Sequence, residues 1–308
     1  MRRTKATDGP DGLLLIDKPA GWTSHDVVAK VRRLLGQRRA GHTGTLDPFA
    51  TGLLVVCLGQ ATRLAEYLTA HDKEYIGEAV LGVETETDDS DGKVTWVRPV
   101  PELAEAAIQA AAARLTGTIL QTPPAFSALK VDGKRAYALA REGRAPELAP
   151  RPVEVRVFEV RLVGTDRVRL RVVCGPGTYI RSLARDLGRQ LGCGAHLASL
   201  RRVRSGELHV REAVTMAELE ALTVAGRAEE VILAADEGLL RWDAAILGAA
   251  GARDFAHGNL HRAAPSRAGG PLRVYAADGR FLGIGEARPG AGVQPLKVLA
   301  GVSAEKKS

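Results

Sequence analysis

The spacing of apolar residues predicts short strands and helices over the first part of the chain. The apolar run at 12–17 ("GLLLID") predicts a short strand, and the longer run at 53–59 ("LLVVCLG") predicts a strand buried on both faces. Between them, apolar residues recur at helical spacing. Thr23 or Ser24 can cap this helix, and Gly36 can end it.

The middle of the chain predicts a hairpin and further helices. Two segments, "VEVRVFEVRLV" and "RVRLRVVC", alternate apolar and polar residues on either side of "GTD", as the strands of a hairpin do. The alternation shifts at Val157 and Phe158, which predicts a bulge there. The acidic run "ETETDDSDG" is interpreted as a solvated loop. Other expected elements are a helix over about 61–68, a strand over 75–82, an alanine-rich helix over about 102–115, a helix starting near 178 and helical structure over 215–235.

The composition of the chain changes near Leu239. Beyond this residue, short apolar bursts are broken by Gly and Pro, as in a small β-barrel. Before it, strands and helices are mixed without regular βαβ alternation, which favours the α+β class with a mixed sheet. The length of 308 residues exceeds the ~100–200 residues of a typical domain. We therefore expect a large α+β domain at 1–238 and a small, mostly β domain at 239–308.

Composition and charge narrow the class of protein. The chain has 43 Lys and Arg residues against 36 Asp and Glu residues and a pI near 9.5, which favours a polyanionic partner such as nucleic acid. Its three cysteines are widely spaced and odd in number, which suits a reducing cytosol. The N-terminus has no apolar signal segment, and no run reaches ~18 apolar residues. We expect a soluble cytoplasmic protein without membrane contact.

One acid stands in an otherwise uncharged loop. The run "RAGHTGTLDPFATGLL" at 39–54 surrounds Asp47 with Gly, Thr and Pro residues. The run lacks the lysine of a phosphate-binding loop, and His42 and Asp47 alone are too few ligands for a metal site. An ionised aspartate here can be a nucleophile toward sugar or base carbons, or it can cap a turn. Residue types and spacing leave both interpretations open.

Four ordered motifs give the chain a family resemblance. They are "GLLLIDKPAGWTSHDVV", "GHTGTLDPFATGLL", "KEYIGEAVLG" and "GPGTYIRSLARDLGRQLGCGAHLASLRRVRSG". Their order and spacing resemble those of the bacterial TruB family, whose members are tRNA pseudouridine-55 synthases. The resemblance is strong over about residues 12–210 and weaker in the tail. It implies a pseudouridine synthase catalytic domain that isomerises uridine in the T-loop of tRNA, without cofactor or metal.

The resemblance also implies catalytic roles for three residues. Asp47 matches the catalytic aspartate, Arg181 the arginine that pairs with it, and Tyr75 a tyrosine that stacks on the target base and is a candidate for proton transfer. An arginine beside Asp47 would keep the carboxylate ionised and oriented. A base within a folded loop is reached only by flipping it into a pocket. Without the resemblance, Tyr75 would be an ordinary buried tyrosine and Arg181 a solvated arginine.

Other matched positions are expected to bind the substrate or to support the site. His42 matches a histidine that contacts the RNA near the vacated stack. Tyr179 and Leu200 match residues that line the uridine pocket. Lys18, with Pro19, matches the first motif; we group Lys18 with the substrate-binding residues, although the role of this motif is mainly structural support.

The tail resembles the small PUA-like RNA-binding module that follows the catalytic domain in this family. Its basic residues are expected to add phosphate contacts without reading bases. They are Arg241, Arg253, Arg262, Arg267, Arg273, Arg280, Arg288 and Lys297. We expect a monomer that binds the T-arm of tRNA.

Two other functions stay open on the sequence alone. A synthase of the same fold could act on a different RNA, or a non-catalytic protein could keep the scaffold to bind or fold RNA. Intact Asp47, Tyr75 and Arg181 argue against a pure binder, and a glycosidase-like hydrolase generally needs two carboxylates. The chain departs from the family pattern at Glu86, where an aspartate is common, in a loop that is not expected to be the reaction centre, so the departure barely affects the expected activity. Attack of Asp47 on C6 of the base and proton removal from C2′ of the sugar are both compatible with the motifs.

Overall fold

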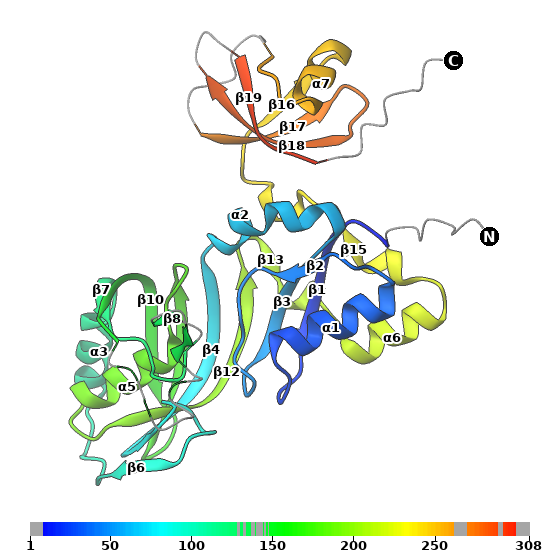
Figure 1. The fold of residues 1–308 in the computed structure, drawn as a ribbon. Helices are drawn as coiled ribbons and strands as arrows, with labels where there is room; N and C mark the ends of the chain where they lie inside the picture. Colours follow the sequence, from blue (N-terminus) through cyan, green and yellow to red (C-terminus); the bar gives the residue numbers. More distant parts are fainter. Residues whose placement is uncertain are drawn as a thin grey trace.

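The computed structural model describes residues 9–127, 130–131, 134–136, 139, 144, 146, 148–261, 270–288 and 292–299. Figure 1 shows two parts, each built on a β-sheet, with the smaller part stacked at one end of the larger. Arg262 and Arg267, two of the expected basic residues of the tail, lie outside the described residues. None of the described helices combines the length and the apolar composition needed to cross a membrane.

A mixed sheet of eleven described strands forms the larger part. Its main path runs in the order β14, β1, β3, β12, β4, β11, β10 and β7, while β2, β13 and β15 pair beside it. The β1–β14 and β3–β12 pairs are parallel, so the predicted mixed sheet is confirmed. The strands span Gly12–Lys18 (β1), Ala40–His42 (β2), Thr51–Leu58 (β3), Lys73–Leu81 (β4), Gly117–Gln121 (β7), Arg151–Leu162 (β10), Arg167–Cys174 (β11), Ala195–Ser205 (β12), Leu208–His209 (β13), Val214–Thr215 (β14) and Ile232–Leu233 (β15). Two separate hairpins join Val83–Thr85 (β5) to Val94–Val97 (β6) and Lys130–Val131 (β8) to Lys134–Arg135 (β9).

Two hydrophobic cores lie on the two faces of the large sheet. Successive residues of β1 alternate between them, because side chains of a strand point to opposite faces: Leu14 and Ile16 join one core, and Leu13 and Leu15 join the other. β3 also contributes to both cores, which confirms the prediction of a strand buried on both faces. Four helices cover the first core, namely α1 (Ser24–Leu35), α3 (Glu105–Arg114), α5 (Ile180–Gln190) and α6 (Met216–Val224).

The predicted cap and end of α1 are confirmed. The Asp26 amide donates to the Thr23 hydroxyl, and the Asp26 carboxylate accepts from the Thr23 amide, which forms a capping box. Gly36 ends the helix with a φ of 62°. These local signals fix the start of α1, next to the loop that carries Asp47.

The smaller part is a four-stranded sheet with one helix. Its strands are β16 (Ala244–Leu247), β17 (Pro271–Ala276), β18 (Phe281–Arg288) and β19 (Gly292–Val298), and α7 (Ala249–Ala256) packs on them. The small, mostly β unit is confirmed, although the sequence analysis missed α7. Ile284 and Leu299 join the core on the far side of β1 and β3, beside α2 (Ala65–Thr69). Lys297 also pairs with Glu66 at 2.7 Å, so the two parts share both an apolar and an ionic contact.

Two predicted helices are partly wrong. α6 ends at Val224, Gly226 takes a φ of 70°, and the chain then runs through a short 3-10 turn into β15, which pairs with β1. Pairing with a buried strand outweighs the helical preference of this stretch. The helix expected over about 61–68 is a 3-10 segment, Gly59–Leu64, followed by the short α2.

The bulge in β10 lies slightly before the predicted position. Its register against β11 shifts between Val155 and Val157, so Arg156 is the extra residue. The apolar alternation changes after it because both Arg156 and Val157 lie between the buried residues Val155 and Phe158.

Gly52 allows β3 and β12 to approach each other, and we expect alanine there to be costly. Its φ is 98°, and a Cβ atom would come within 2.3 Å of the Arg202 carbonyl oxygen. Gly117 is a matched control, because its φ is 93° but its Cβ would meet nothing within 4 Å. Both alanines carry backbone strain on the order of 1–3 kcal/mol. Gly52→Ala should lower the free energy of unfolding in urea by at least about 1 kcal/mol more than Gly117→Ala, because it adds overpacking. Equal losses would contradict this reading of the contact.

Candidate active site

Asp47 lies in a loop between β2 and β3 that is fixed on both sides. The Ser24 hydroxyl, at the start of α1, donates to the Leu46 carbonyl (3.1 Å) and accepts from the Leu46 amide (2.8 Å). On the other side of Asp47, the Gly21 amide donates to the Pro48 carbonyl (2.8 Å). The loop therefore presents the carboxylate from an anchored backbone.

Arg181 holds the carboxylate of Asp47 in a two-point ion pair. It lies in the first turn of α5, and its Nε and Nη2 atoms are 2.9 and 3.1 Å from the two carboxylate oxygens. Its guanidinium also donates to the carbonyl oxygens of Thr87 (2.8 Å) and Phe126 (3.0 Å). The side chain of Arg181 is 5% exposed, whereas that of Asp47 is 31% exposed. The cation is thus buried, while the carboxylate still meets accessible space.

The acidic run that follows β4 is buried against α5, so its interpretation as a solvated loop is wrong for its central residues. Asp89 lies 3.4 Å from Arg181, and Asp88 lies 2.8 Å from Arg185, one turn further along the helix. Burial raises the pKa of both aspartates, and the neighbouring arginines oppose this shift. Through Thr87 and Asp89, this loop also contacts Arg181, the partner of Asp47. Glu86, at which the chain departs from the family pattern, is itself exposed.

Tyr75 on β4 lies opposite Arg202 on β12. Burial raises the pKa of Tyr75, and the Arg202 guanidinium opposes that shift; the phenol is therefore protonated at neutral pH. Arg202 is 3% exposed and donates to the carbonyls of Leu53 (2.7 Å) and Gly44 (3.1 Å), which ties β12 to the loop of Asp47. Sequence analysis missed this arginine, because nothing in the basic run "LRRVR" separates it from its neighbours.

Lys18 supports the loop and has no donor left for RNA. Its side chain is fully buried, and Nζ donates to the carbonyl oxygens of Pro19 (2.8 Å), Trp22 (2.7 Å) and Pro48 (3.2 Å). Burial lowers the pKa of Lys18 to about 8, while the negative charge of Asp47 acts in the opposite direction. Its grouping with the substrate-binding residues is therefore corrected to a supporting role, in line with the structural role implied for its motif.

His42 ends β2, just before the loop of Asp47. Its ring packs edge-on against that of His25, with 5.4 Å between ring centroids, and its Nδ1 accepts from the Gly44 amide at 3.3 Å. Burial lowers the pKa of His42 to about 4, and the nearby His25 and Arg202 shift it in the same direction. The ring is therefore neutral at pH 7 and carries its proton on Nε2.

Tyr179 is the residue before α5, and Leu200 lies on β12. The side-chain amide of Gln121 donates to the Tyr179 carbonyl (3.0 Å) and accepts from the Tyr179 amide (2.8 Å), which fixes the start of α5. The Arg151 guanidinium lies 5.2 Å from the centroid of the Tyr179 ring. Leu200 is 7% exposed and lines a pocket beside Asp47.

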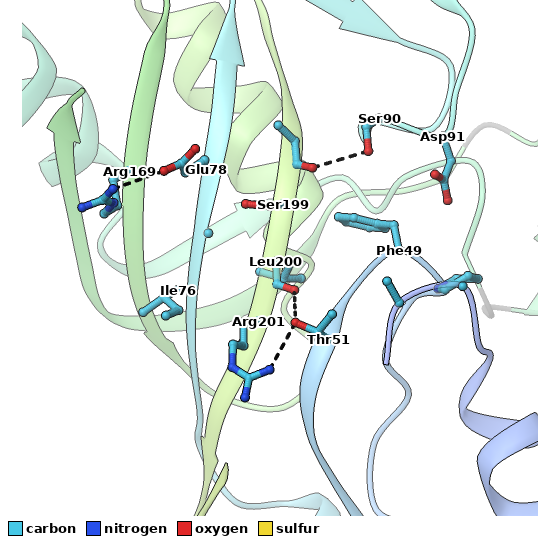
Figure 2. Close-up of a pocket in the computed structure, with 15 residues that line it drawn as sticks. Phe49, Thr51, Ile76, Glu78, Ser90, Asp91, Arg169, Ser199, Leu200 and Arg201 are labelled. Carbon is cyan, nitrogen blue, oxygen red and sulfur yellow. Dashed lines mark hydrogen bonds and ion pairs between the residues drawn. The ribbon is translucent and has the colours of Figure 1, made fainter. Parts of the chain in front are cut away.

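This pocket, of about 590 Å³, opens where β3 and β12 separate. The two strands pair only through Arg201 and Arg202 of β12. Figure 2 shows Phe49, which follows the loop of Asp47, and Leu200 on either side of the gap. The lining combines apolar side chains, such as Phe49 and Leu200, with polar ones, such as Thr51 and Arg201, and this mixture suits a flat group with polar edges, such as a nucleobase.

The arrangement can perform nucleophilic or base chemistry at one carboxylate. Asp47 and Arg181 are in direct contact, and the charge of Asp47 also acts on the pKa of Tyr75. A fixed, ionised carboxylate can attack carbon or accept a proton, and a neutral phenol can exchange one. Within the part of the chain that the structure describes, no group of three or more His, Cys, Asp or Glu residues is placed to hold a metal ion.

Family models match the chain over most of its length. The N-terminal domain of the TruB family pseudouridylate synthases matches residues 32–180. The tRNA pseudouridylate synthase B C-terminal domain matches residues 181–243, and the C-terminal model of pseudouridine synthase II TruB matches residues 244–299.

Curated relatives and solved structures agree with these matches. The chain is 49% identical to the tRNA pseudouridine synthase B of Thermobifida fusca (strain YX), over 94% of this chain and 99% of that protein. It is 42% identical to the protein of that name from Stutzerimonas stutzeri (strain A1501), over 94% and 95%. A chain in the crystal structure of a Cbf5-Nop10-Gar1 complex is 26% identical, with a TM-score of 0.71 over 94% of this chain and 84% of that one. A chain in a structure of an H/ACA RNP bound to a substrate RNA containing 2′-deoxyuridine shares the fold, with a TM-score of 0.72 at 23% identity over 97% and 92%.

The lowered pKa of His42 predicts a contribution to acid sensitivity. The folded state takes up this proton near pH 4, whereas the unfolded chain takes it up near pH 6.5, so the unfolded chain binds more protons between these values. The free energy of unfolding therefore falls as the pH is lowered through this window. His42→Gln should show a shallower fall than wild type between pH 6.5 and 4 in urea denaturation, and parallel curves would contradict burial of a neutral ring.

Proposed function

Because the chain belongs to the TruB family of pseudouridine synthases, we propose that it isomerises uridine 55 in the T-loop of tRNA to pseudouridine. The pseudouridine synthase activity and the tRNA substrate follow from relatives that are 42–49% identical over nearly the whole chain and are named tRNA pseudouridine synthase B. The proposal also includes three finer points: the modified uridine is at position 55, the enzyme recognises the T-arm, and it acts as a monomer.

The observation that carries the proposal is the anchored Asp47–Arg181 pair, next to a pocket that Pro48 and Phe49 of the same loop help to line. The bidentate guanidinium stabilises the ionised carboxylate and fixes the direction of its open side. In the reaction the N1–C1′ bond breaks and a C5–C1′ bond forms, while C5 loses a proton and N1 gains one. Asp47 supplies the electron pair that starts this exchange, as a nucleophile toward C6 of the base or as a base toward C2′ of the sugar. Both routes begin from the same ionised carboxylate.

The target base has to leave its stack to reach this carboxylate. The pocket between β3 and β12 accepts the flipped base, with Leu200 in its wall. Tyr179 is not among the residues that line this pocket, so its place beside the base rests on the family resemblance alone. His42, neutral and at the edge of the same loop, contacts the RNA that remains. Because the imidazole is neutral, no second buried positive charge stands next to the guanidinium of Arg202.

Tyr75 stacks on the base and exchanges the proton of C5. Its pKa is raised by burial, so the phenol enters the reaction protonated. It can therefore receive the C5 proton only after giving its own proton to N1 of the base, and Arg202 beside it stabilises the transient phenolate. In this order of events, the Tyr75 hydroxyl passes protons between atoms of the base.

The smaller part of the protein, from about residue 239, adds phosphate contacts as a PUA-like domain. The two other candidate functions have weaker support. The chain is 23–26% identical to chains in the Cbf5-Nop10-Gar1 and H/ACA RNP structures, well below its identity to the tRNA pseudouridine synthase B relatives. A pure RNA binder has no need for a partly exposed carboxylate, because it repels phosphates.

We expect Asp47→Asn to abolish pseudouridine formation while tRNA binding is retained. Asparagine keeps the shape and can still accept from Arg181, but it provides neither a nucleophile nor a base. The measurement is incubation of an unmodified tRNA transcript with protein, followed by mapping of pseudouridine to the nucleotide. A transcript with cytidine at position 55 is the control for the site. Turnover by Asp47→Asn near the wild-type rate would overturn the role of Asp47, and modification elsewhere by wild type would overturn position 55.

Replacing Arg181 by lysine should slow single-turnover formation of pseudouridine on the order of 10²-fold at saturating protein, because an ammonium cannot form the two-point pair. Arg185→Lys is the matched control. Arg185 is similarly buried on the same helix, but it pairs with Asp88 and Asp186 and has no contact with Asp47. Both variants lose a buried ion pair, so similar thermal destabilisation is expected. A similar loss of rate in both would assign the effect of Arg181 to general stability.

A further inference from the structure

A second pocket, of about 420 Å³, lies away from Asp47 at the far end of α5. The β5–β6 hairpin forms one side, through Glu84, Trp96 and the neighbouring Arg98. The end of α5 and the turn after it form the other, through Arg189 and Gly194. Figure 1 shows β6 at the end of the molecule opposite the small C-terminal sheet. Neither the proposed chemistry nor the family resemblance gives this pocket a role.

Arg98 is held in this pocket by two contacts, and its guanidinium N–H groups have no hydrogen-bond acceptor among the described residues. Its guanidinium carbon lies 3.6 Å from the centroid of the Trp96 ring, a stacked cation–π contact. Its backbone amide donates to the Gly82 carbonyl at 2.8 Å, which anchors the residue. Among the described residues, no carboxylate forms an ion pair with Arg98, whereas Arg169, Arg171, Arg185 and Arg189 each have one. A stacked guanidinium with free N–H groups is ready to bind an anion.

Arg189 adds a second, partly neutralised charge. It pairs with Glu84 at 3.3 Å, longer than a tight ion pair, and 58% of its side chain is exposed. The pocket therefore holds two guanidiniums and one carboxylate, a net charge of +1. Gly194 closes one side at close range, since a Cβ there would come within 2.8 Å of the Trp96 ring and of Glu84.

The ligand is better described as a phosphate than as a base. One face of Trp96 is covered by Arg98, and the ring also packs against Gly194. The indole is therefore not open as a stacking platform. What the pocket offers is a pair of planar forks, which match the oxygens of a phosphodiester.

The pocket is physically linked to the candidate active site. Arg181 and Arg189 lie eight residues apart on α5, about 12 Å along the helix axis. The chain from β5 onward also reaches both places, because Glu84 of β5 lines the pocket while Thr87 and Asp89, just after β5, contact Arg181. A folded RNA engaged at Asp47 is much longer than this distance, so its backbone is long enough to span from Asp47 to this pocket.

We propose that the Arg98–Trp96–Arg189 pocket binds a backbone phosphate of the RNA substrate outside the catalytic pocket. This proposal rests on the proposed function, because the RNA bound at this pocket is the same RNA whose uridine is engaged at Asp47. It gives the enzyme a phosphate contact at the end opposite the C-terminal sheet, independent of sequence.

The test is equilibrium binding of full-length tRNA to the whole protein as a function of salt. Arg98→Gln should weaken binding roughly five- to tenfold near 0.1 M salt and lower the slope of log K against log[salt] by about one. Arg114→Gln, an exposed arginine of α3, is the control for loss of one positive charge and should change neither quantity. Glu84→Gln should act in the opposite direction and tighten binding several-fold, because it releases Arg189.

The proposal is overturned if Arg98→Gln matches the Arg114→Gln control in affinity and slope, or if Glu84→Gln weakens binding. Titration with inorganic phosphate and with uridine monophosphate separates a site for free anions from an RNA contact. Arg98-dependent binding of these ions without any change in tRNA affinity also overturns the proposal. Because the readout is binding, it remains decisive even if no pseudouridine forms at position 55.

Discussion

Burial of the positive charge of Arg181 constrains the whole centre of the larger part. A guanidinium removed from water has to find acceptors for its donors, since a charge buried without partners is very costly. Here the acceptors come from three segments that are distant in sequence: the loop of Asp47, the acidic run at Thr87 and Asp89, and the stretch after β7 at Phe126. One side chain thereby joins the helix α5 to three loops. The partly exposed carboxylate of Asp47 is the ionised group of this cluster that a substrate can meet.

The separation of β3 and β12 forms the pocket in which a substrate can meet the Asp47 carboxylate. The strands meet closely at Gly52, where the Arg202 backbone leaves no room for a side chain, and they separate immediately beyond it. Arg202 points across the junction and holds the start of the Asp47 loop through the Gly44 carbonyl. The pocket is therefore a consequence of sheet geometry, and its wall moves only if the strand pairing moves. This explains how a site built largely on loops can remain well defined.

Local signals made much of the fold and the position of Asp47 predictable from sequence. The capping box at Thr23, the left-handed Gly36 and the apolar runs of β1 and β3 depend on neighbours in sequence, and all were recovered. The burial of Asp88 and Asp89 could not be recovered in this way, because an acidic run without its partners is indistinguishable from a solvated loop. Arg202 was missed for the same reason, and Lys18 was understood only once its three carbonyl partners were visible. Whether a charged side chain is buried depends on partners that are far away in the chain. The pairing of Arg181 with Asp47 was therefore expected only from the family resemblance.

The core that lies between the two parts has a thermodynamic consequence. Leu13, Leu53 and Leu68 from the larger part and Ile284 and Leu299 from the smaller part bury one another in a single cluster. Neither part can lose its structure without exposing apolar surface of the other, so their unfolding free energies are not separable. Heat should therefore melt the protein in one cooperative transition, and the C-terminal sheet should behave as a rigid continuation of the catalytic sheet.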